Sequence, residues 1–316
     1  MKILIADKFP EAHANTLRDQ GHQLLIDASL ADASLAAALP GYEVLIVRST
    51  KVSAAAIDSG DALRLIIRAG SGYNTIDTAH AASRGVAVAN TPGMNAIAVA
   101  ELAMGLLLAV DRQIPDNVIA SRAGVWDKAR FGKADGLYGR TLGLVGAGQI
   151  GAELTVRARA FGMRVLIYDP YLSPAKVAAL GAEQVAELHE IASRSDAVSV
   201  HVPKTASTTH LIDGAFLEAM REGAILLHTS RGGVVDDAAL LAALDSRRLR
   251  AGLDVFEDEP AASKGEFPSA LAQHPRVVAT HHIGASTSQA QDAVADEVMV
   301  IIEALASRDE VIHRVN

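Results

Sequence analysis

Residues 141–151, TLGLVGAGQIG, are the stretch from which the fold of the whole chain is inferred. The first half, residues 141–145, is a short apolar run typical of a buried parallel strand. Gly146, Gly148 and Gly151 follow with the spacing G-x-G-x-x-G, the pattern of a turn that lets a pyrophosphate approach the backbone at the start of a helix. The free amide groups of that helix would face the anion.

The residues after the glycines complete a dinucleotide-binding unit. Residues 149–161 predict a helix, and residues 164–169 predict a second strand ending at Asp169, about 20 residues beyond the glycines. A carboxylate there accepts hydrogen bonds from both ribose hydroxyls of an adenosine and repels a 2′-phosphate. Three glycines alone also fit an ordinary turn, but strand, glycines, helix, strand and acid in this order predict NAD rather than NADP.

The composition limits the class of protein. The chain has 316 residues, more than one hydrophobic core usually serves, so two domains are expected. A net charge of −8 disfavours a general nucleic-acid or acidic-membrane surface, because such a body repels polyanions. The absence of cysteine excludes disulfides, thiolate catalysis and thiolate metal ligands, and we predict no metal site. No signal peptide or bilayer-spanning stretch is visible, so a cytoplasmic protein is expected.

Short apolar runs alternate with helical segments on both sides of the glycine motif. This alternation predicts an α/β protein with two doubly wound parallel sheets. Further strands are expected at residues 3–6, 23–27, 44–47, 65–67, 86–89, 197–200, 224–228, 250–254 and 277–280. Residues 95–112 predict an apolar helix that fits either an internal core helix or a subunit contact. Residues 124–139 predict a polar loop.

Two strands of the first half end in arginines that precede loops of small residues. Arg48 precedes Ser49 and Thr50, and Arg68 precedes the segment 69–72. Because ligands of open α/β sheets bind outside the carboxyl ends of the strands, these arginines and the loop amides are candidates for binding an anion. Each arginine alone also fits a solvated strand end.

Three polar residues near strand ends in the second half are candidates for chemistry. Arg231, in a glycine-containing turn, can bind a carboxylate in a bidentate way. His282 can protonate a ketone that accepts hydride, because imidazolium is available near neutral pH. Glu259 would favour that protonated form if it lies beside the imidazole. Each of the three taken singly also fits an ordinary surface position.

Seven further motifs occur in order along nearly the whole chain. They are VRST (47–50), RAGSGYNTID (68–77), NTPGMN (90–95), VAE (99–101), SRGGVVD (230–236), LDVFEDEP (253–260) and HIGAST (282–287). With the glycine motif, this set resembles the D-isomer-specific 2-hydroxyacid dehydrogenases, most of all the members that oxidise D-3-phosphoglycerate. The resemblance implies a NAD-binding Rossmann domain, residues 93–284, inserted into a flavodoxin-like substrate domain, residues 1–92 and 285–316.

The resemblance also implies roles for individual residues. Arg231 would bind and polarise the substrate, His282 would be the acid/base, Glu259 its partner, and Asp254 would hold the nicotinamide carboxamide. The cofactor-binding residues would be Gly146, Gly148, Gln149, Ile150, Gly151, Asp169, Pro170, Thr229, Asp254 and Gly284. The substrate-binding residues would be Arg48, Ser49, Arg68, Gly70, Ser71, Gly72 and Asn95. Among these, the amides of residues 70–73 would bind the carboxylate, and Arg48 a phosphate.

Three residues depart from the family pattern. His281 stands where proline is usual, so two adjacent histidines compete for one role, although Ile283 and Gly284 fix the register on His282. Tyr73 replaces a small aliphatic residue beside the substrate loop. Lys204 stands where leucine is typical.

The resemblance predicts reversible NAD-dependent oxidation of D-3-phosphoglycerate to 3-phosphooxypyruvate, the reaction that begins serine synthesis. A homodimer is expected, formed by the helix after Pro92 and the loop around Trp126, with Lys128 or Arg130 reaching the neighbouring site. No C-terminal regulatory domain is expected. Two alternatives stay open: a reductase of an unphosphorylated 2-oxo acid of the glyoxylate, hydroxypyruvate or D-lactate type, and a NAD-sensing interaction protein like the corepressors that share this fold.

Overall fold

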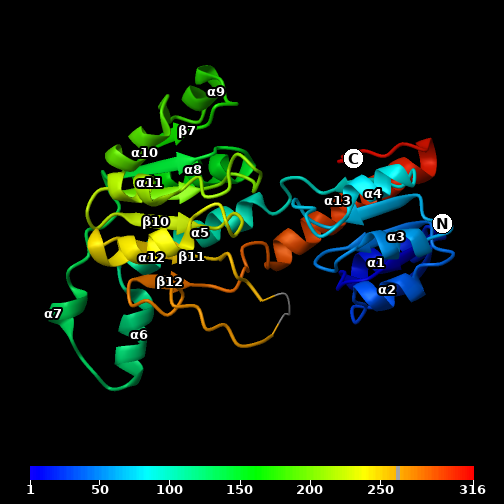
Figure 1. Cartoon of the computed structure of the whole chain (residues 1–316), viewed down its shortest axis with the longest axis horizontal. Helices are drawn as coiled ribbons and strands as arrows, with labels where there is room; N and C mark the ends of the chain where they lie inside the picture. Colours follow the sequence, from blue (N-terminus) through cyan, green and yellow to red (C-terminus); the bar gives the residue numbers. More distant parts are fainter. Residues whose placement is uncertain (261–263) are drawn as a thin grey trace. The chain divides into compact units, whose positions relative to one another are not determined.

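The chain forms two compact units, each built on its own parallel sheet (Figure 1). A computed structural model describes residues 1–260 and 264–316. Unit 1 contains Met1–Asn95 and Ser286–Asn316, and unit 2 contains Ala96–Ala285. The predicted α/β class with two doubly wound parallel sheets is confirmed. Among the described residues, no helix has the length and apolar character needed to cross a membrane.

Unit 1 contains a five-stranded sheet in the order β2-β1-β3-β4-β5, which is the flavodoxin-like order. Its strands are β1 (Lys2–Ile5), β2 (Gln23–Ile26), β3 (Val44–Val47), β4 (Leu65–Arg68) and β5 (Ala87–Asn90). Its helices are α1 (Glu11–Asp19), α2 (Asp32–Ala38), α3 (Ala54–Ser59), α4 (Thr78–Ser83) and α13 (Ser288–Arg308). The buried positions of the central strands β1, β3 and β4 are apolar, because α1 and α13 cover one face of the sheet and α2, α3 and α4 cover the other.

The last residues of the chain extend the sheet of unit 1 beyond β5. The amide of Val315 donates to the carbonyl of Val88 at 2.8 Å, and the amide of Asn90 donates to the carbonyl of His313 at 3.2 Å. The Asn316 side chain accepts a hydrogen bond from the Val88 amide at 2.8 Å. These contacts fix the end of β5, from which the loop at residues 91–95 begins.

Unit 2 contains a seven-stranded sheet in the order β12-β11-β10-β9-β6-β7-β8, whose core is the dinucleotide-binding order. Its strands are β6 (Thr141–Val145), β7 (Arg164–Tyr168), β8 (Glu183–Gln184), β9 (Ala197–Val200), β10 (Ile225–His228), β11 (Arg250–Leu253) and β12 (Val277–Ala279). The order reverses between β6 and β9, and ligands of such sheets bind at the carboxyl ends of the strands beside this point.

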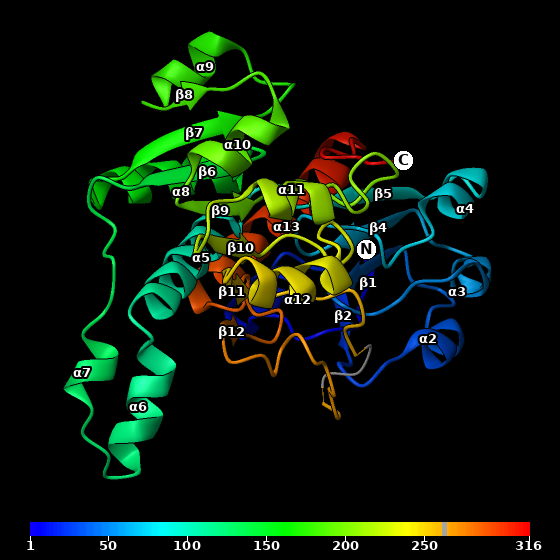
Figure 2. The same ribbon diagram turned by 60° about the vertical axis from the view of Figure 1, so that its left-hand side comes forward.

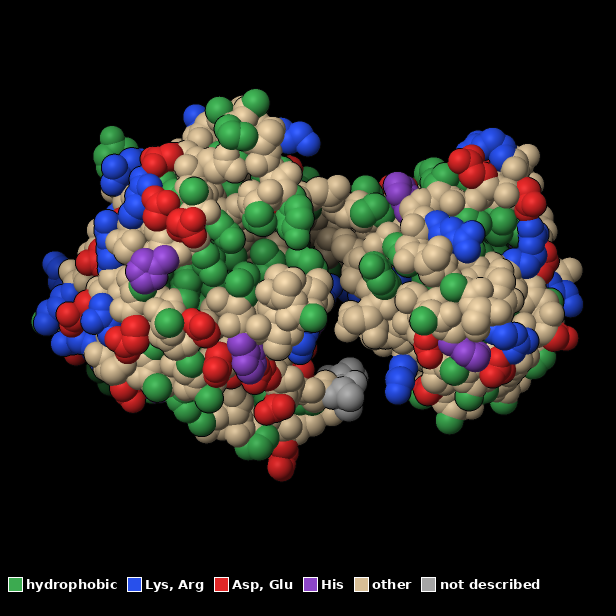
Figure 3. Space-filling model, turned by 45° about the horizontal axis from the view of Figure 1, so that its top comes forward, with side chains coloured by type: hydrophobic (Ala, Val, Ile, Leu, Met, Phe, Trp, Pro, Cys, Tyr) green, Lys and Arg blue, Asp and Glu red, His purple; other side chains and the backbone are tan. Residues whose placement is uncertain are grey.

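Helices cover both faces of this sheet. The helices of unit 2 are α5 (Ala96–Asp111), α6 (Ile114–Arg122), α7 (Lys128–Phe131), α8 (Gln149–Ala160), α9 (Pro174–Ala179), α10 (Leu188–Arg194), α11 (Gly214–Ala219) and α12 (Asp237–Ser246). One hydrophobic cluster contains residues of α5 and α8, and the other contains residues of α10, α11 and α12. On the side of the molecular surface that Figure 3 shows, acidic and basic side chains are interspersed, and no large patch carries charge of one sign.

The structure decides between the two interpretations of the apolar helix predicted at residues 95–112. It also corrects the prediction of a loop at residues 124–139. Most residues of α5 are buried against α8, β10 and β11, so α5 is a core helix of unit 2. The segment expected to be a polar loop contains α7, whose first turn is capped because the Asp127 carboxylate accepts a hydrogen bond from the Arg130 amide. Figure 2 shows α6 and α7 projecting from the sheet of unit 2, and α6 has no buried residue.

Candidate active site

The three glycines after β6 have different surroundings. Gly146 has φ +87°, and a Cβ there would lie 2.8 Å from the Val202 side chain. A Cβ on Gly151 would lie 2.7 Å from the Gly146 carbonyl oxygen, so this glycine lets α8 pack against the turn. A Cβ on Gly148 would meet no protein atom within 4 Å. Gly148 therefore borders open space, which is available to a ligand.

The first turn of α8 offers hydrogen-bond donors to that space. Gly148 is the N-cap residue, and no side chain caps the helix. Within the described ranges, the amides of Gly148, Gln149 and Ile150 donate to no protein acceptor. Unpaired amides and the helix dipole together make an anion-binding site, and the residues here fit the pyrophosphate of a dinucleotide.

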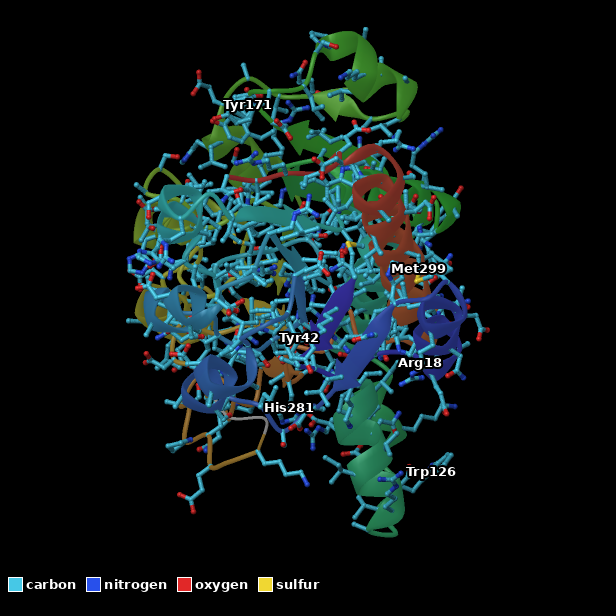
Figure 4. All side chains as sticks on the ribbon, turned by 90° about the vertical axis from the view of Figure 1, so that its right-hand side faces the viewer. Arg18, Tyr42, Trp126, Tyr171, His281 and Met299 are labelled. Atoms are coloured by element: carbon cyan, nitrogen blue, oxygen red, sulfur yellow. The ribbon has the colours of Figure 1, made fainter. Side chains whose placement is uncertain are left out.

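Asp169 follows β7 and is fixed beside the glycine turn. Its Oδ2 accepts a hydrogen bond from the Ala147 amide at 2.9 Å, and its Oδ1 accepts one from the Tyr171 amide at 2.9 Å. Pro170 and Tyr171 next to it are exposed, and Figure 4 labels the Tyr171 side chain. The carboxylate is thus held at the end of the strand where an adenosine ribose binds in such folds.

Glu259 and His282 are in direct contact. The Nδ1 atom of His282 lies 2.7 Å from Oε2 of Glu259, and Oε1 of Glu259 accepts a hydrogen bond from the Phe256 amide at 2.9 Å. Burial opposes ionisation of Glu259, but the hydrogen bonds from His282 and Phe256 and the charges of His282 and Arg231 outweigh it and lower the Glu259 pKa. Glu259 is therefore ionised near neutral pH.

An ionised Glu259 determines which protons the imidazole of His282 carries. A carboxylate can only accept, so Nδ1 of His282 carries a proton and donates it. The other ring nitrogen, Nε2, is left to exchange a proton with a substrate, and the side chain is 46% exposed. Among the described residues, Glu259 makes no hydrogen bond with His281, so the carboxylate pairs with the second of the two adjacent histidines.

Arg231 lies in the turn after β10. Its guanidinium donates to the Ser230 carbonyl at 2.6 Å, burial lowers its pKa, and the charge of Glu259 opposes that shift. A Cβ on Gly232 would collide with the carbonyl of Phe256, so the turn packs closely on the segment that carries Glu259. Arg231, Glu259 and His282 thus form one electrostatic group.

His228 is a residue of this site that the sequence interpretation did not include. Its buried Nε2 donates a hydrogen bond to the Arg231 carbonyl at 3.0 Å, and the Ser230 hydroxyl donates to Nδ1 at 3.3 Å. Burial lowers the pKa of His228 to about 4, so it is neutral at pH 7. The sequence feature that could have identified His228 is a polar residue at the end of the otherwise apolar strand ILLH.

The other expected cofactor residues also lie in unit 2. Asp254 is 1% exposed, and its carboxylate accepts a hydrogen bond from the Gly284 amide at 2.9 Å. The Thr229 hydroxyl is buried, and no partner for it occurs within residues 1–260 and 264–316. The ammonium of Lys204 lies against Gly233, beside the Arg231 turn.

The expected substrate residues belong to unit 1, at the carboxyl ends of β3 and β4. The Asp7 carboxylate accepts hydrogen bonds from the amides of Arg48, Ser49 and Thr50 at 2.6, 3.0 and 3.1 Å and from the Ser49 hydroxyl at 2.9 Å. These donors are therefore committed inside the protein. Of this group, the Arg48 guanidinium is the part left to meet a ligand.

The loop after β4 has amides available. Gly70 has φ +141° and lies directly under the Arg68 guanidinium. The Ser71 hydroxyl donates to the Asn95 side chain at 3.0 Å, and the Ser71 carbonyl accepts from the Asn90 side chain at 2.6 Å. In the described parts of the chain, the amides of residues 71–73 donate to no protein acceptor.

The fold and these residues define a class: a dinucleotide-binding α/β protein with a histidine–carboxylate pair and an arginine on later strands of the same sheet. Residues 104–284 match the family profile described as D-isomer specific 2-hydroxyacid dehydrogenase, NAD binding domain. The chain belongs to this family of 2-hydroxyacid dehydrogenases. The predicted cofactor, NAD, is confirmed by this match.

Individual relatives show how close the similarity is. D-3-phosphoglycerate dehydrogenase of Methanocaldococcus jannaschii is 38% identical over 308 residues, which are 96% of this chain and 57% of that protein. The chain spans about half the length of the curated relatives it matches. The TT0316 protein from Thermus thermophilus is 32% identical, with a TM-score of 0.90 and both chains covered fully. A glyoxylate reductase from Paecilomyes thermophila is 26% identical, with a TM-score of 0.87, and 100% of this chain and 98% of that chain are covered.

Proposed function

We propose that the protein oxidises D-3-phosphoglycerate reversibly to 3-phosphooxypyruvate with NAD. The observation that carries this proposal is a group of cations at the carboxyl ends of three adjacent strands of unit 1. Lys8 follows β1, Arg48 and Lys51 follow β3, and Arg68 ends β4. A phosphorylated acid needs such a group, because the net charge of the whole protein is −8 and repels anions. Relatives 38–41% identical are named D-3-phosphoglycerate dehydrogenases.

In this proposal unit 1 carries the residues that recognise the substrate, and unit 2 carries the residues of the chemistry. In unit 1, the amides of residues 71–73 would bind the substrate carboxylate, and Arg48 would bind the phosphate. The amides of residues 48–50 already donate to Asp7, so only side chains there are available to bind the phosphate. Unit 2 would bind NAD at the α8 amides and Asp169. That residues 1–92 and 285–316 form the substrate domain remains a prediction.

The chemistry follows from the protonation states of the residues in unit 2. NAD, when held by the α8 amides and Asp169, would supply the acceptor for the hydride from carbon 2 of the hydroxy acid. Nε2 of His282 takes the hydroxyl proton at the same carbon, while Glu259 holds the imidazole through Nδ1 and stabilises the imidazolium that results. Arg231 stabilises the negative charge that develops on the carbonyl oxygen. In the reverse direction His282 returns the proton to that oxygen.

A substrate panel tests the proposal. Purified protein is assayed with D-3-phosphoglycerate and D-lactate as donors, and with hydroxypyruvate and glyoxylate as acceptors of hydride from NADH. We expect kcat/KM to be highest for phosphoglycerate. The variant Arg48→Gln should raise the KM for phosphoglycerate at least tenfold, since a charged hydrogen bond is worth about 1.5–3 kcal/mol, and leave kcat/KM for the unphosphorylated acids near that of the parent.

Two outcomes would replace the proposal. A preference for glyoxylate or hydroxypyruvate, with no effect of Arg48→Gln, would identify a reductase of unphosphorylated acids, as the similarity to a glyoxylate reductase allows. Binding of NAD without turnover of any of these acids would favour the NAD-sensing interaction protein. Serine synthesis and a cytoplasmic location remain predictions.

We further propose that the protein is a homodimer and that α6 with the segment after it forms the contact. Five apolar side chains in this region are exposed: Ile114, Val118, Ile119, Val125 and Trp126. Trp126, labelled in Figure 4, is 88% exposed. Clustered exposed apolar residues mark interaction sites, and the contact of Lys128 or Arg130 with the neighbouring site remains a prediction of the same dimer.

A further inference from the structure

The segment at residues 280–284, which carries His282, is bonded to one buried carboxylate. Oδ1 of Asp254 accepts hydrogen bonds from the Thr280 hydroxyl at 2.6 Å and from the Ile283 amide at 2.9 Å, and Oδ2 accepts one from the Gly284 amide at 2.9 Å. The main-chain carbonyl of Asp254 accepts the His282 amide at 2.8 Å. Four donors on both sides of the imidazole therefore converge on a single residue.

His282 needs such support because of its backbone. Its φ is +51°, in the left-handed region that residues other than glycine rarely adopt. Backbone of this kind persists where surrounding contacts determine it. The bonds of Asp254 to Thr280 before the histidine and to Ile283 and Gly284 after it supply those contacts.

The segment after β11 that carries Asp254 also holds Glu259, the partner of the histidine. Asp254, Phe256 and Glu259 follow β11 in a short stretch of chain, and the Phe256 amide fixes Oε1 of Glu259 at 2.9 Å. Asp254 thus fixes the backbone of His282, and Phe256 fixes the carboxylate that His282 contacts. Both ends of the 2.7 Å hydrogen bond between His282 and Glu259 are anchored to the segment after β11.

The hydrogen-bonding capacity of Asp254 shows what the residue mainly does. A carboxylate has about four acceptor positions, and three are occupied by the segment 280–284. The residue is 1% exposed, so water does not compete for these positions. At most one position, on Oδ2, is left for a nicotinamide carboxamide.

We propose that Asp254, acting through Thr280, is the positioning residue that holds His282 against Glu259. This inference rests on the proposed role of His282 as the acid/base. It assigns Asp254 a function that is separable from cofactor binding. Thr280 provides the means to separate the two, because its hydroxyl bonds to Asp254.

The test compares Thr280→Val, which removes the hydroxyl at nearly constant volume, with Thr280→Ser, which keeps it. We expect Thr280→Val to lower kcat about tenfold, the effect of losing one hydrogen bond to a charged group, while the Kd for NAD changes less than the kcat. Thr280→Ser should restore kcat. The control is Thr16→Val on α1, which removes an exposed hydroxyl that bonds to the Ala12 carbonyl.

A second readout does not depend on turnover. The proton on Nδ1 of His282 should give a downfield NMR resonance, because it donates to a carboxylate, and this resonance is assigned by its loss in His282→Gln. We expect it in the parent, in Thr280→Ser and in Thr16→Val, and expect it weakened in Thr280→Val. Since the resonance reports on geometry alone, a parent without dehydrogenase activity would refute the proposed function and leave this test valid.

Asp254→Asn provides an independent variant, since an amide nitrogen cannot accept the hydrogen bonds now made to one of the carboxylate oxygens. We expect it to lower kcat more than Thr280→Val does and to abolish the resonance. An unchanged resonance and unchanged kcat in both folded variants would overturn the proposal. A loss confined to the Kd for NAD would also overturn it, because Asp254 would then act as a cofactor ligand alone.

Discussion

At the scale of single residues, we predict that the carboxylate of Asp169 determines which dinucleotide fits. Its two oxygens are fixed by the amides of Ala147 and Tyr171, so a 2′-phosphate cannot displace it without breaking both bonds. We predict that Asp169→Ala raises the KM for NAD about tenfold, the cost of roughly one charged hydrogen bond, and reduces the preference for NAD over NADP. Steady-state kinetics with both cofactors measures this.

The matched control for Asp169 is Asp213→Ala. Asp213 caps α11 by accepting the Phe216 amide, so its loss should reduce stability without changing cofactor preference. An Asp169→Ala variant whose ratio of kcat/KM for NAD and NADP equals that of the parent would contradict the role of this carboxylate.

The proposed catalytic residues could be predicted because motifs carry them, whereas the contacts that hold them in place could not. Arg231, Glu259 and His282 belong to motif segments that can be identified from order and composition. Asp7 acts on amides about 40 positions away, and Asp254 acts on amides about 30 positions away. Backbone amides have no signature in a sequence, so such contacts appear only once the strands are in register.

At the scale of elements, β10 ends in a buried neutral histidine, and this makes stability depend on pH. The pKa of His228 falls from 6.5 in the unfolded chain to about 4 in the folded protein. Its contribution is complete above pH 6.5 and is lost as the pH falls through 4, because the unfolded chain binds the proton more tightly. The loss is on the order of 3 kcal/mol.

Urea unfolding between pH 7 and pH 4 measures this effect. We predict that the free energy of unfolding of the parent falls over this range and that His228→Asn falls less steeply. His201, whose pKa burial lowers from 6.5 to about 3, adds the same trend over the same pH range and remains in both proteins. The control is His80→Asn, which removes a partly exposed histidine paired with Asp58. Equal slopes in the parent and His228→Asn would refute the assignment.

The burial of each element explains which elements could be predicted from the sequence. Buried parallel strands such as β3 and β6 consist of continuous apolar residues, so their bounds were predicted to the residue. α6 has no buried residue, so no apolar periodicity marks it. β8 has two residues, Glu183–Gln184, and is defined only by its pairing with β7.

At the scale of the whole molecule, we predict that the protein is a homodimer in solution and that Ile119→Asp makes it monomeric. Ile119 is 64% exposed on α6, and burying a new carboxylate in an apolar contact costs several kcal/mol. Light scattering coupled to size-exclusion chromatography measures the mass of both proteins.

Val300→Asp provides the control for the dimer, because Val300 is also an exposed apolar residue on a helix but belongs to α13 of unit 1. We expect this variant to keep the mass of the parent. A monomeric parent, or a dimer that persists in Ile119→Asp, would show that α6 is not the contact.

The discontinuity of unit 1 has a consequence for the order in which the chain folds during synthesis. All of unit 2 is contained in Ala96–Ala285, so its core can form as soon as that stretch has left the ribosome. One face of the unit 1 sheet is covered by Val298, Ile301 and Ile302 of α13, which leave the ribosome after all of unit 2. The first strands of the chain must therefore wait, with apolar surface uncovered, while the whole NAD-binding unit is made. A chaperone that binds nascent apolar strands would meet this protein at its N-terminal sheet.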